Sequence, residues 1–359
     1  MKIVLAGGGT AGHVEPALAV ARAWRSHHPK DLIEFIGTAS GLENQLVPAA
    51  GFKLSHIPKV IIPRKFSLSL FVAPTTLTQA FLESRSALKG ADLLIGFGGY
   101  VSAPAYLAAR SLKIPFVIHE ANAKPGLANR LGALFTNYLA IAQPVHRGEL
   151  SKALITGLPL RADVASALKS SSKDWAAART KAKKSIGFDS TAPVIAIFFG
   201  SQGSVALNKV IAASLKTLTE SGVQVLHAVG KANSLPSATK GYKPVSYIED
   251  MANTYLAADL IISRSGAVTC SEVNALGKYA LFIPLPIGNG EQKLNARLVV
   301  EQSRGEIVDQ PDFTPQWVEK HLHRLLANAS SASPAGSASD IDATEKIVAL
   351  MESALKGGK

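Results

Sequence analysis

The stretch from Asp259 to Arg297 contains two apolar segments, and each is followed by a turn and a helix-forming segment. The first apolar segment, residues 260–262, stops at an Arg-Ser-Gly turn, and residues 267–275 have the pattern of a helix. The second, residues 280–284, leads through a Gly/Asn loop at 288–290 into another helix. Consecutive strand–turn–helix units predict an α/β fold with a parallel sheet.

The two helix starts in this stretch predict a diphosphate site, because backbone N–H groups lie free there and the helix dipole is positive. Glu272 lies one to two turns into the first helix, within reach of a sugar hydroxyl beside that diphosphate. Gln292 and Asn295 share a face of the next helix. Neutral amides and one acid suit a sugar rather than a metal. The alternative is a structural unit whose helix is capped by Ser265 and Thr269.

The length of 359 residues suggests about two domains, each able to bury a full core. A formal net charge of +12 favours an anionic partner: a nucleic acid, a membrane surface or a phosphorylated substrate. The basic residues are scattered, without aromatic interleaving or zinc-finger spacing, so we expect no nucleic-acid partner. Cys270 is the only cysteine, which excludes an intrachain disulfide and indicates a reducing compartment.

The N-terminus reads as a strand rather than a signal peptide. No uncharged apolar run approaches the roughly 20 residues of a membrane-spanning helix. We therefore expect any contact with a membrane to be made from its surface. Residues 59–77 could make that contact, because apolar side chains there lie among Lys59, Arg64 and Lys65, as in patches that bind anionic lipid. The alternative is a core helix with basic flanks. The apolar members are Ile61, Ile62, Phe66, Leu68, Leu70, Phe71 and Val72.

Residues 7–12 match the dinucleotide fingerprint G-x-G-x-x-G between a strand at 2–6 and a helix at 16–24. That fingerprint normally has an acid near the end of the second strand, which holds the ribose. Here the only acid of that strand, Glu34, lies inside it, so an NAD-dependent oxidoreductase is a weak alternative. His13 at the helix start could act as a general base or an orienting donor, or could merely cap the helix or face water.

Other predicted strands also end in polar or glycine-rich turns. Gly98-Gly99-Tyr100 follows one strand, residues 119–122 follow another, and residues 200–204 follow the strand at 194–199. Each half of the chain therefore opens with a strand, a glycine-rich turn and a helix, which predicts a duplicated architecture although no sequence repeat is evident. The remaining expected elements are strands at 223–229 and 245–247, a crossing with a surface helix at 165–185, a loop at 327–340 and an amphipathic helix at 343–356.

Five segments carry a family resemblance. They are GGGTAGHVEPALAVA (7–21), GFGGYVSAPAYLAA (96–109), HEANAKPGLANR (119–130), FGSQGSVALN (199–208) and SRSGAVTCSE with EQKLNA (263–296). In this order and at these spacings they resemble the MurG family of bacterial peripheral enzymes. These are the UDP-N-acetylglucosamine–N-acetylmuramyl-(pentapeptide) pyrophosphoryl-undecaprenol N-acetylglucosamine transferases.

The resemblance implies a glycosyltransferase fold of the B type, with two Rossmann-like domains facing across a cleft. It places an acceptor and membrane-associated domain at residues 1–162, with the helix 341–359 packing back on it. Residues 163–340 would form the domain that binds UDP-N-acetylglucosamine.

The implied reaction is an inverting transfer of N-acetylglucosamine to the 4-hydroxyl of the muramic acid unit, without a catalytic metal or other cofactor. The partners would be UDP-N-acetylglucosamine, the undecaprenyl-diphosphate-linked muramyl-pentapeptide and an anionic membrane surface. The protein would lie peripherally on the cytoplasmic face of the bacterial cell membrane and serve peptidoglycan synthesis. Two alternatives remain: a related B-type transferase with another acceptor, and a nucleotide-sugar binding module without turnover.

Position by position, the resemblance places His13 and Glu120 on the acceptor side; we expect His13 to be the base or to position the acceptor, with Glu120 as the competing candidate. Tyr100 and Asn129 would line the acceptor side. The residues expected to contact UDP-N-acetylglucosamine are Thr10, Ala11, Gly12, Asn122, Arg161, Ser201, Ile248, Ala267, Val268, Thr269, Cys270, Ser271, Glu272, Gln292 and Asn295. Three positions depart from the family pattern: Ala11 replaces a glycine, Leu158 an asparagine, and Glu291 a glutamine found in some relatives.

Overall fold

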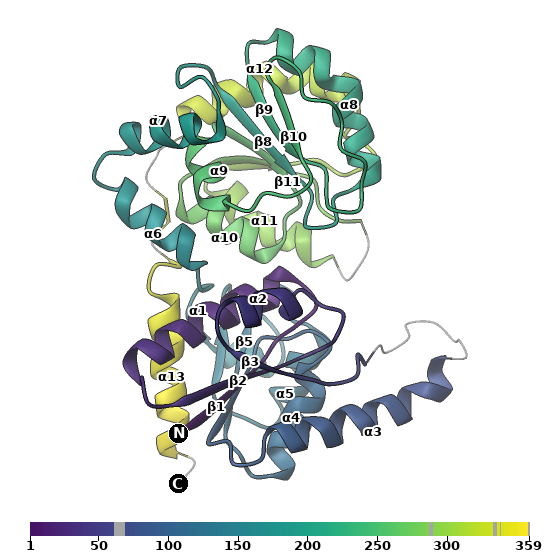
Figure 1. Ribbon diagram of the computed structural model, residues 1–359, viewed down its shortest axis with the longest axis vertical. Coiled ribbons are helices and arrows are strands. Elements are labelled where there is room, and N and C mark those ends of the chain that lie inside the picture. Colours follow the sequence, from purple (N-terminus) through teal and green to yellow (C-terminus); the bar gives the residue numbers. More distant parts are fainter. Residues whose placement is uncertain (61–68, 287–289, 333–335, 338, 358–359) are drawn as a thin grey trace. The chain divides into compact units, whose positions relative to one another are not determined.

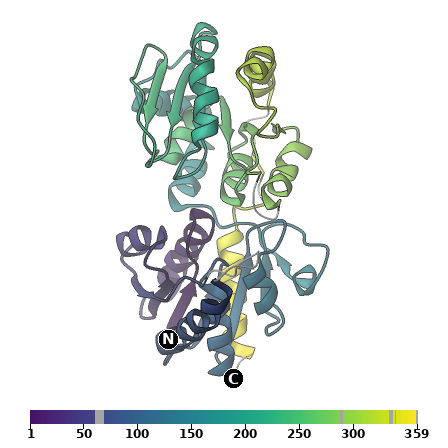
Figure 2. The ribbon, with the colours of Figure 1, turned by 90° about the vertical axis from the view of Figure 1, so that its right-hand side faces the viewer.

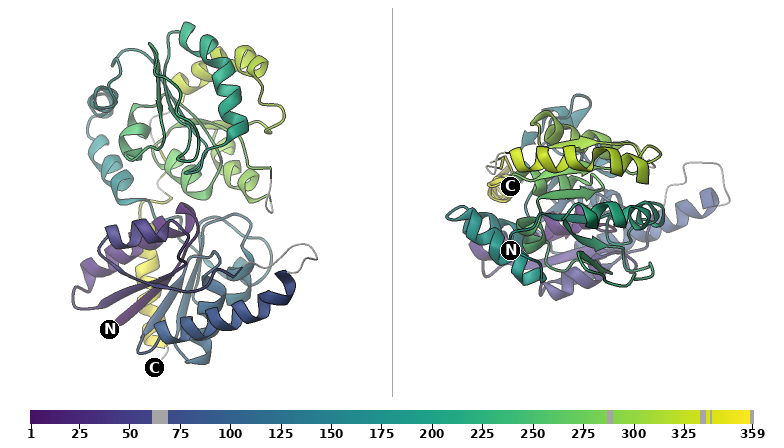
Figure 3. Two further views of the ribbon diagram at one scale, coloured as in Figure 1. Left: turned by 45° about the vertical axis from the view of Figure 1, so that its right-hand side comes forward. Right: turned by 90° about the horizontal axis from the view of Figure 1, so that it is seen from above.

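The computed structural model describes residues 1–60, 69–286, 290–332, 336–337 and 339–357 (Figure 1). The chain divides into two compact units. The N-terminal unit consists of Met1–Arg161 and Ser339–Lys359, and the C-terminal unit of Ala162–Ala338. Each unit is a parallel sheet with helices on both of its faces, which Figure 3 shows from two further directions.

In the N-terminal unit the described residues form a seven-stranded parallel sheet in the order β3-β2-β1-β4-β5-β6-β7. The strands are β1 Lys2–Ala6, β2 Leu32–Gly37, β3 Lys53–His56, β4 Leu93–Gly96, β5 Phe116–Glu120, β6 Leu139–Ile141 and β7 Leu154–Ile155. The helices are α1 Ala11–His27, α2 Glu43–Ala49, α3 Ser69–Ala87, α4 Ser102–Ser111, α5 Leu127–Gly132, the 3-10 helix η1 Glu149–Lys152 and α13 Ala343–Gly357. Within β1, Ile3 and Leu5 pack with α1 and α13, whereas Val4 and Ala6 pack with α3 and α4. Because both faces are covered, this strand is apolar along most of its length.

The C-terminal unit repeats this plan with a six-stranded parallel sheet in the order β10-β9-β8-β11-β12-β13. The strands are β8 Val194–Phe198, β9 Gln224–Ala228, β10 Tyr242–Val245, β11 Leu260–Ser263, β12 Tyr279–Phe282 and β13 Gly305–Ile307. The helices are α6 Ala162–Ser171, α7 Trp175–Ile186, α8 Val205–Glu220, α9 Met251–Ala257, α10 Ala267–Ala275, α11 Glu291–Glu301 and α12 Pro315–Ser331. Ile195 and Ile197 of β8 pack with α8 and α12, and Ala196 and Phe198 pack with α9 and α10.

Four helices of this unit begin with a side-chain cap, in which Asp174, Ser204, Asp250 or Thr314 accepts a backbone N–H from the first turn. Helix α10 differs, because its N-cap is Gly266 and no side chain caps it. The alternative, in which Ser265 and Thr269 cap this helix, is therefore wrong, and the start of α10 lacks the side-chain acceptor that those four helix starts have.

Several expected elements have other boundaries; the helix expected at 16–24, for example, is α1 and extends from Ala11 to His27. The strand expected at 245–247 is β10, which begins earlier because Tyr242 pairs with Val225 of β9. Residues 165–185 belong to two helices rather than one, and α12 continues to Ser331, into the expected loop. Alanine-rich sequence favours that continuation, since alanine has the highest helix propensity.

Helix α13 returns to the N-terminal unit, where Figure 2 shows it in yellow beside the sheet. Ile347 and Met351 are fully buried in the same cluster as residues of α1. The Nε2 atom of His28 lies 3.0 Å from Oε1 of Glu352, which joins the ends of the two helices. The last helix is therefore part of the first core.

No helix in the described part of the chain is both long and apolar enough to cross a membrane. The side chains of residues 61–74, which make up most of the predicted lipid-binding patch, lie outside the described residues. At its edge, the ammonium of Lys59 lies 4.9 Å from the centre of the Tyr100 ring.

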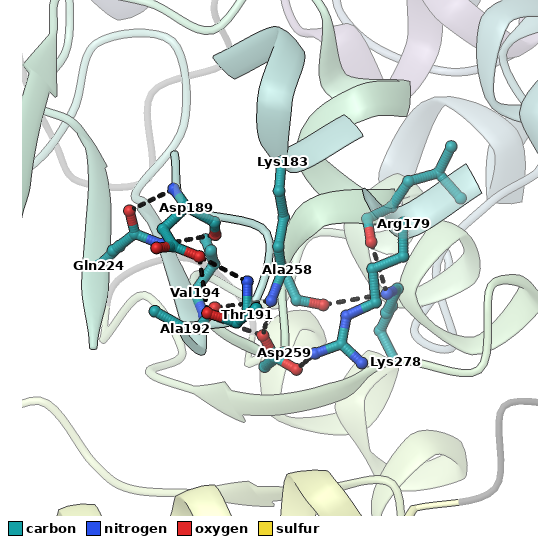
Figure 4. A network of polar contacts seen from close by, with 11 residues as sticks. Arg179, Lys183, Asp189, Thr191, Ala192, Val194, Gln224, Ala258, Asp259 and Lys278 are labelled. Carbon is teal, nitrogen blue, oxygen red and sulfur yellow. Dashed lines mark hydrogen bonds and ion pairs between the residues drawn. The ribbon is translucent and has the colours of Figure 1, made fainter. Parts of the chain in front are cut away.

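Two cations pair with the carboxylate of Asp259 beside α7 in the C-terminal unit, and a third cation, Lys278, lies near them (Figure 4). Asp259 accepts the N–H of Val194 at 2.8 Å and pairs with Arg179 and, at 3.1 Å, with Nζ of Lys183. Nearby, Nζ of Lys278 donates to the carbonyl oxygens that end α9, those of Leu256 at 3.2 Å and Ala258 at 2.9 Å. A cation at that end is favoured by the helix dipole. However, burial, together with Arg179 and Lys183, lowers the pKa of Lys278 to about 7.

The lowered pKa of Lys278 predicts a pH-dependent stability. Between pH 7.5 and 9 the unfolded chain binds one more proton at this lysine than the folded chain, because the pKa of an unfolded lysine is 10.5. The free energy of unfolding of the wild type should therefore rise relative to that of Lys278→Met, by about 1.4 kcal/mol per pH unit. Urea unfolding followed by tryptophan fluorescence measures this difference. The exposed Lys216→Met is the control and should parallel the wild type, whereas a wild type that parallels Lys278→Met would contradict the assignment.

Candidate active site

His13 lies in the first turn of α1, directly after the glycine-rich loop that follows β1. Its Nδ1 atom lies 3.1 Å from the carbonyl oxygen of Gly8 and 3.2 Å from Oγ1 of Thr10. Because a carbonyl oxygen can only accept, we assign the proton of the neutral imidazole to Nδ1. The lone pair is then on Nε2, which makes no hydrogen bond with the described residues. The Nε2 atom of His13 can therefore accept a proton.

Two glycines after β4 make room for this imidazole. Gly98 and Gly99 have φ values of +90° and +81°. A Cβ on Gly98 would lie 3.4 Å from the His13 ring, and one on Gly99 only 2.6 Å from the carbonyl oxygen that holds Nδ1. Burial lowers the pKa of His13, although the charges of Glu120 and Glu43 and the hydrogen bond to the loop oppose this change. The imidazole is thus neutral at neutral pH and able to accept a proton.

Glu120, the competing candidate for the base, is buried at the end of β5. Its Oε1 accepts the backbone N–H of Asn122 at 2.9 Å and the side-chain amide of Asn122 at 3.1 Å. Its Oε2 accepts the N–H of Gly126 at 2.9 Å and Nδ2 of Asn129 at 3.0 Å. The carboxylate thus holds the turn after β5, and its negative charge favours a proton on His13.

The two residues expected on the acceptor side have different environments. Asn129 is buried, with its Oδ1 accepting the hydroxyl of Tyr106 at 2.7 Å and its Nδ2 donating to the carbonyl oxygen of His119 at 3.1 Å. Tyr100 is 46% exposed and lies beside Gly9. The Tyr100 ring is therefore accessible to a ligand, whereas the side chain of Asn129 makes hydrogen bonds within the N-terminal unit.

The other predicted residues of the N-terminal unit lie at the ends of its strands. Thr10 and Ala11 are exposed and Gly12 is half-buried at the start of α1, where N–H groups have no intrahelical partner. Asn122 is half-buried in the turn that Glu120 holds, and Arg161 is half-buried at the end of the first segment of this unit.

In the C-terminal unit, α10 begins at the carboxyl end of β11. Val268, Thr269 and Ser271 are half-buried, whereas Ala267 and Cys270 are buried. Burial raises the pKa of the Cys270 thiol, as expected for a side chain that packs in the core. The first-turn N–H groups remain available for an anion. Two further predicted residues, Glu272 on this helix and Ile248 after β10, are also buried.

Ser201 lies half-buried in the turn after β8, which packs on the backbone that follows β9. A Cβ on Gly203 would lie 1.9 Å from the carbonyl oxygen of Val229, so only glycine fits at this contact. Nδ2 of Asn233 donates to the carbonyl oxygens of Gln202 and Val229, each at 2.8 Å. The turn that contains Ser201 is therefore held by the segment that follows β9.

The two predicted sugar-binding amides of α11 reach the neighbouring turns. Oε1 of Gln292 accepts the N–H of Leu285 at 3.0 Å, just beyond the end of β12. Asn295 is fully buried, and its Nδ2 lies 3.4 Å from the carbonyl oxygen of Ser265, before α10. Both side chains thus lie at the edge of the sheet where α10 begins.

Arg264 connects the turns at this edge. Its Nη1 donates to the carbonyl oxygens of Ile283 and Pro284, both at 3.0 Å. Its Nη2 donates to Oε1 of Gln310 at 2.6 Å and lies 3.4 Å from Oγ of Ser204. All four acceptors are neutral, and the ion pairs of the described residues include none for Arg264. A half-buried guanidinium without a carboxylate supplies positive charge where an anion would bind. The described residues contain no group of three His, Cys, Asp or Glu side chains arranged for a metal ion.

Comparison with known proteins identifies the family. Residues 3–141 match the N-terminal domain of glycosyltransferase family 28, and residues 194–351 match its C-terminal domain. The chain belongs to glycosyltransferase family 28. Within this family it is similar to a Corynebacterium glutamicum protein, with 44% identity covering 98% of this chain and 99% of that protein. A Streptomyces coelicolor protein is 43% identical and covers 91% of this chain and 90% of its own length. Both are named UDP-N-acetylglucosamine–N-acetylmuramyl-(pentapeptide) pyrophosphoryl-undecaprenol N-acetylglucosamine transferase.

Solved structures agree with this assignment. The crystal structure of Acinetobacter baumannii MurG, a protein 28% identical, superposes with a TM-score of 0.68 and covers 98% of this chain and 99% of that one. A UDP-GlcNAc 2-epimerase from Neisseria meningitidis, 15% identical, shares the fold with a TM-score of 0.69 over 98% of this chain and all of that one. This family 28 member is therefore a glycosyltransferase with two Rossmann-like domains of the B type, and the predicted family and fold are confirmed.

Two polar residues near these sites, Arg264 and Glu43, were not among the candidate residues predicted from the sequence. Arg264 had a usable signal, since a cation directly after a buried strand and before a glycine lies where open sheets bind ligands. Glu43 had none, because it lies outside every glycine-rich motif and its partners come from two separate loops.

Replacing Arg264 should weaken the binding of UDP and leave the binding of uridine unchanged. Arg264→Gln removes the positive charge but keeps a polar side chain. We expect the Kd for UDP to rise roughly 10- to 100-fold, as for a lost charge-assisted contact. Titration calorimetry with UDP and competition with uridine give the two values. Arg297→Gln, an exposed change on α11, is the control. Equal weakening of UDP and uridine binding would show that Arg264 only maintains the fold.

Proposed function

We propose that this chain transfers N-acetylglucosamine from UDP-N-acetylglucosamine to the 4-hydroxyl of the muramyl unit of an undecaprenyl-diphosphate-linked muramyl-pentapeptide. The observation that carries the proposal is the nearly full-length similarity, at 41–44% identity, to relatives that are named for this transfer. Each unit also contains groups that such a reaction requires.

On the donor side, the first-turn N–H groups of α10 and the guanidinium of Arg264 would stabilise the charge of the departing UDP. Dipoles and charges already fixed in the fold do this without reorganising during the reaction. Glu272 would bind the ribose hydroxyls, the backbone of Ile248 would bind the uracil, and Gln292 would bind the transferred sugar.

On the acceptor side, Nε2 of His13 would take the proton of the 4-hydroxyl as the oxygen forms a bond to the anomeric carbon. The bond between that carbon and the diphosphate oxygen breaks, and UDP leaves with the electron pair. Attack opposite the leaving group inverts the configuration at the anomeric carbon. We favour His13 over Glu120 as the base, because four hydrogen-bond donors occupy the carboxylate of Glu120.

An assay of UDP release tests both the reaction and the base. The full-length protein should release UDP rapidly only when UDP-N-acetylglucosamine and the lipid-linked muramyl-pentapeptide are both present. His13→Ala should lower kcat about 10²- to 10⁴-fold, the usual contribution of a general base, and leave the KM for the donor unchanged.

His27→Ala, at the exposed end of the same helix, is the matched control and should keep the wild-type rate. A His13→Ala variant whose kcat stays within a few-fold of the wild type would exclude His13 as the base. Binding of the donor without acceptor-dependent release of UDP would instead indicate a nucleotide-sugar binding module.

We also propose that the chain acts as a peripheral protein on the cytoplasmic face of the membrane, through its N-terminal unit. Leu127, Leu131 and Leu134 are 64%, 36% and 64% exposed. Their spacing of four and three residues places them on one face of α5 and the turn after it. The exposed side chains of Lys124 and Arg130 lie close by in the sequence. Apolar side chains beside cations suit an anionic lipid surface, as does the net charge of +12.

Changing Leu127, Leu131 and Leu134 together to Ser should weaken binding to liposomes that contain phosphatidylglycerol, because the apolar contact with the acyl chains is lost. Sedimentation with liposomes measures this, and UDP binding should not change. A matched control changes the exposed Leu32 and Leu154 of the same unit to Ser. If the triple variant binds these liposomes as the wild type does, this face does not contact the membrane.

A further inference from the structure

Glu43 is a buried carboxylate without a cationic partner. It lies in the first turn of α2 and is fully buried. Its Oε1 accepts the backbone N–H of Thr38 at 2.8 Å and the hydroxyl of Thr38 at 2.9 Å, and its Oε2 accepts the N–H of Gly9 at 2.8 Å. The ion pairs of the described residues include none for this carboxylate. Burying an unpaired charge costs free energy, so its position needs a specific reason.

The contact with Gly9 connects Glu43 to His13 through one peptide group. The N–H of Gly9 and the carbonyl of Gly8 belong to the same planar unit and point in opposite directions, because the peptide is trans. On one side the N–H donates to Glu43 at 2.8 Å, and on the other side the carbonyl accepts Nδ1–H of His13 at 3.1 Å. A carboxylate, a peptide and an imidazole thus form one chain of hydrogen bonds.

The backbone makes room for this carboxylate. A Cβ on Gly8 would lie 2.6 Å from Oε1 of Glu43, one on Gly37 would lie 2.5 Å from its Cγ, and one on Gly41 would lie 1.9 Å from its Oε2. Gly8 comes from the loop after β1, Gly37 is the last residue of β2, and Gly41 lies in the loop after β2. Side chains at these positions would displace Glu43, so the glycine-rich loop is shaped around an acid of the protein itself.

We infer that Glu43 is a positioning residue that fixes the Gly8–Gly9 peptide and thereby the orientation and tautomer of His13. This role rests on the proposed function of His13 as the base. The carboxylate polarises the peptide, which makes the carbonyl of Gly8 a stronger acceptor for Nδ1–H. As His13 takes up a proton at Nε2, the resulting imidazolium is stabilised by that stronger hydrogen bond.

The same contact explains why the loop fits a dinucleotide poorly. In the dinucleotide fold the N–H groups of this loop and the helix start bind a pyrophosphate. Here the N–H of Gly9 already donates to a carboxylate, whose negative charge would repel a phosphate. The glycine pattern is therefore retained for the orientation of a histidine rather than for a cofactor.

Other groups from three separate loops and strands also surround His13. Gly98 and Gly99 pack against its ring from the loop after β4, and Oγ1 of Thr10 lies 3.2 Å from its Nδ1. Glu120 contributes a second negative charge from β5, but its four hydrogen bonds go to the turn after that strand. Of the two carboxylates, Glu43 is the one linked to His13 by hydrogen bonds, through the peptide between Gly8 and Gly9.

The test is Glu43→Gln in the full-length protein labelled with ¹⁵N-histidine. Subtraction of the spectrum of His13→Gln identifies the signals of His13 among the nine histidines. In the wild type, Nδ1 should carry the proton of the neutral form. In Glu43→Gln we expect a mixture of tautomers and a lower pKa of His13, since a negative charge is lost. We also expect kcat to fall roughly 10- to 100-fold, as when outer partners of functional histidines are removed, with an unchanged donor KM.

Thr38→Val is the matched control, because it removes a donor to Oε1 and leaves the contact with Gly9 in place. It should leave the tautomer and pKa of His13 unchanged. If Glu43→Gln does not fold, Glu43→Asp keeps the charge but withdraws it from Gly9, and the same mixture of tautomers is expected.

The two ideas fail separately. An unchanged His13 tautomer and pKa in a folded Glu43 variant would overturn the positioning role, whatever the rate. A changed His13 signal in a protein whose kcat does not depend on His13 would support the positioning by Glu43 and exclude His13 as the base.

Discussion

Parallel pairing of buried strands is the constraint on which every candidate residue depends. Strands covered on both faces are mostly apolar, so most candidate residues lie at or beyond their carboxyl ends, which lie along one edge of each sheet. In the N-terminal unit, β2, β1, β4 and β5 are neighbours, and the loops that follow them contain Thr38, His13, Gly98 and Asn122. In the C-terminal unit, β8, β11 and β12 bring together the Ser201 turn, the start of α10 and the contacts of α11. Segments far apart in the sequence meet because the pairing of the parallel strands places their carboxyl ends side by side.

Many of the polar side chains at these edges make hydrogen bonds to the backbone of the surrounding turns. Glu120, Asn233 and Arg264 each bind two or more main-chain or amide groups from different segments. Turns between buried elements contain N–H and carbonyl groups that cannot all pair with one another, and a buried unpaired group costs free energy. A site built from main-chain amides therefore needs such side chains around it, since they keep the free amides fixed in direction.

The sequence predicted the elements whose signal is local. Apolar runs such as residues 260–262 and glycine-rich turns gave the two sheets, and the ordered motifs gave the family. The boundary of β10 failed because its start follows from its register with β9, and that of α12 failed because alanine-rich sequence continues the helix. The expected capping of α10 failed because the backbone places Gly266 at the N-cap. Glu43 could not be found, since its relation to His13 passes through a peptide group and has no pattern of residue types. The roles of the candidate residues stay predictions, and the side chains of residues 61–74 lie outside the described part of the chain.

The return of α13 to the N-terminal unit has a consequence for biosynthesis. Ile347 and Met351 fill the core beside β1 and α1, yet they follow the whole C-terminal unit in the sequence. The C-terminal unit is one continuous segment, so it is fully translated before the first unit can bury its final helix. During translation the earlier unit therefore exposes an apolar surface until α13 has left the ribosome. A ribosome stalled before α13 emerges would hold a nascent chain in that incomplete state, which is a substrate for chaperones.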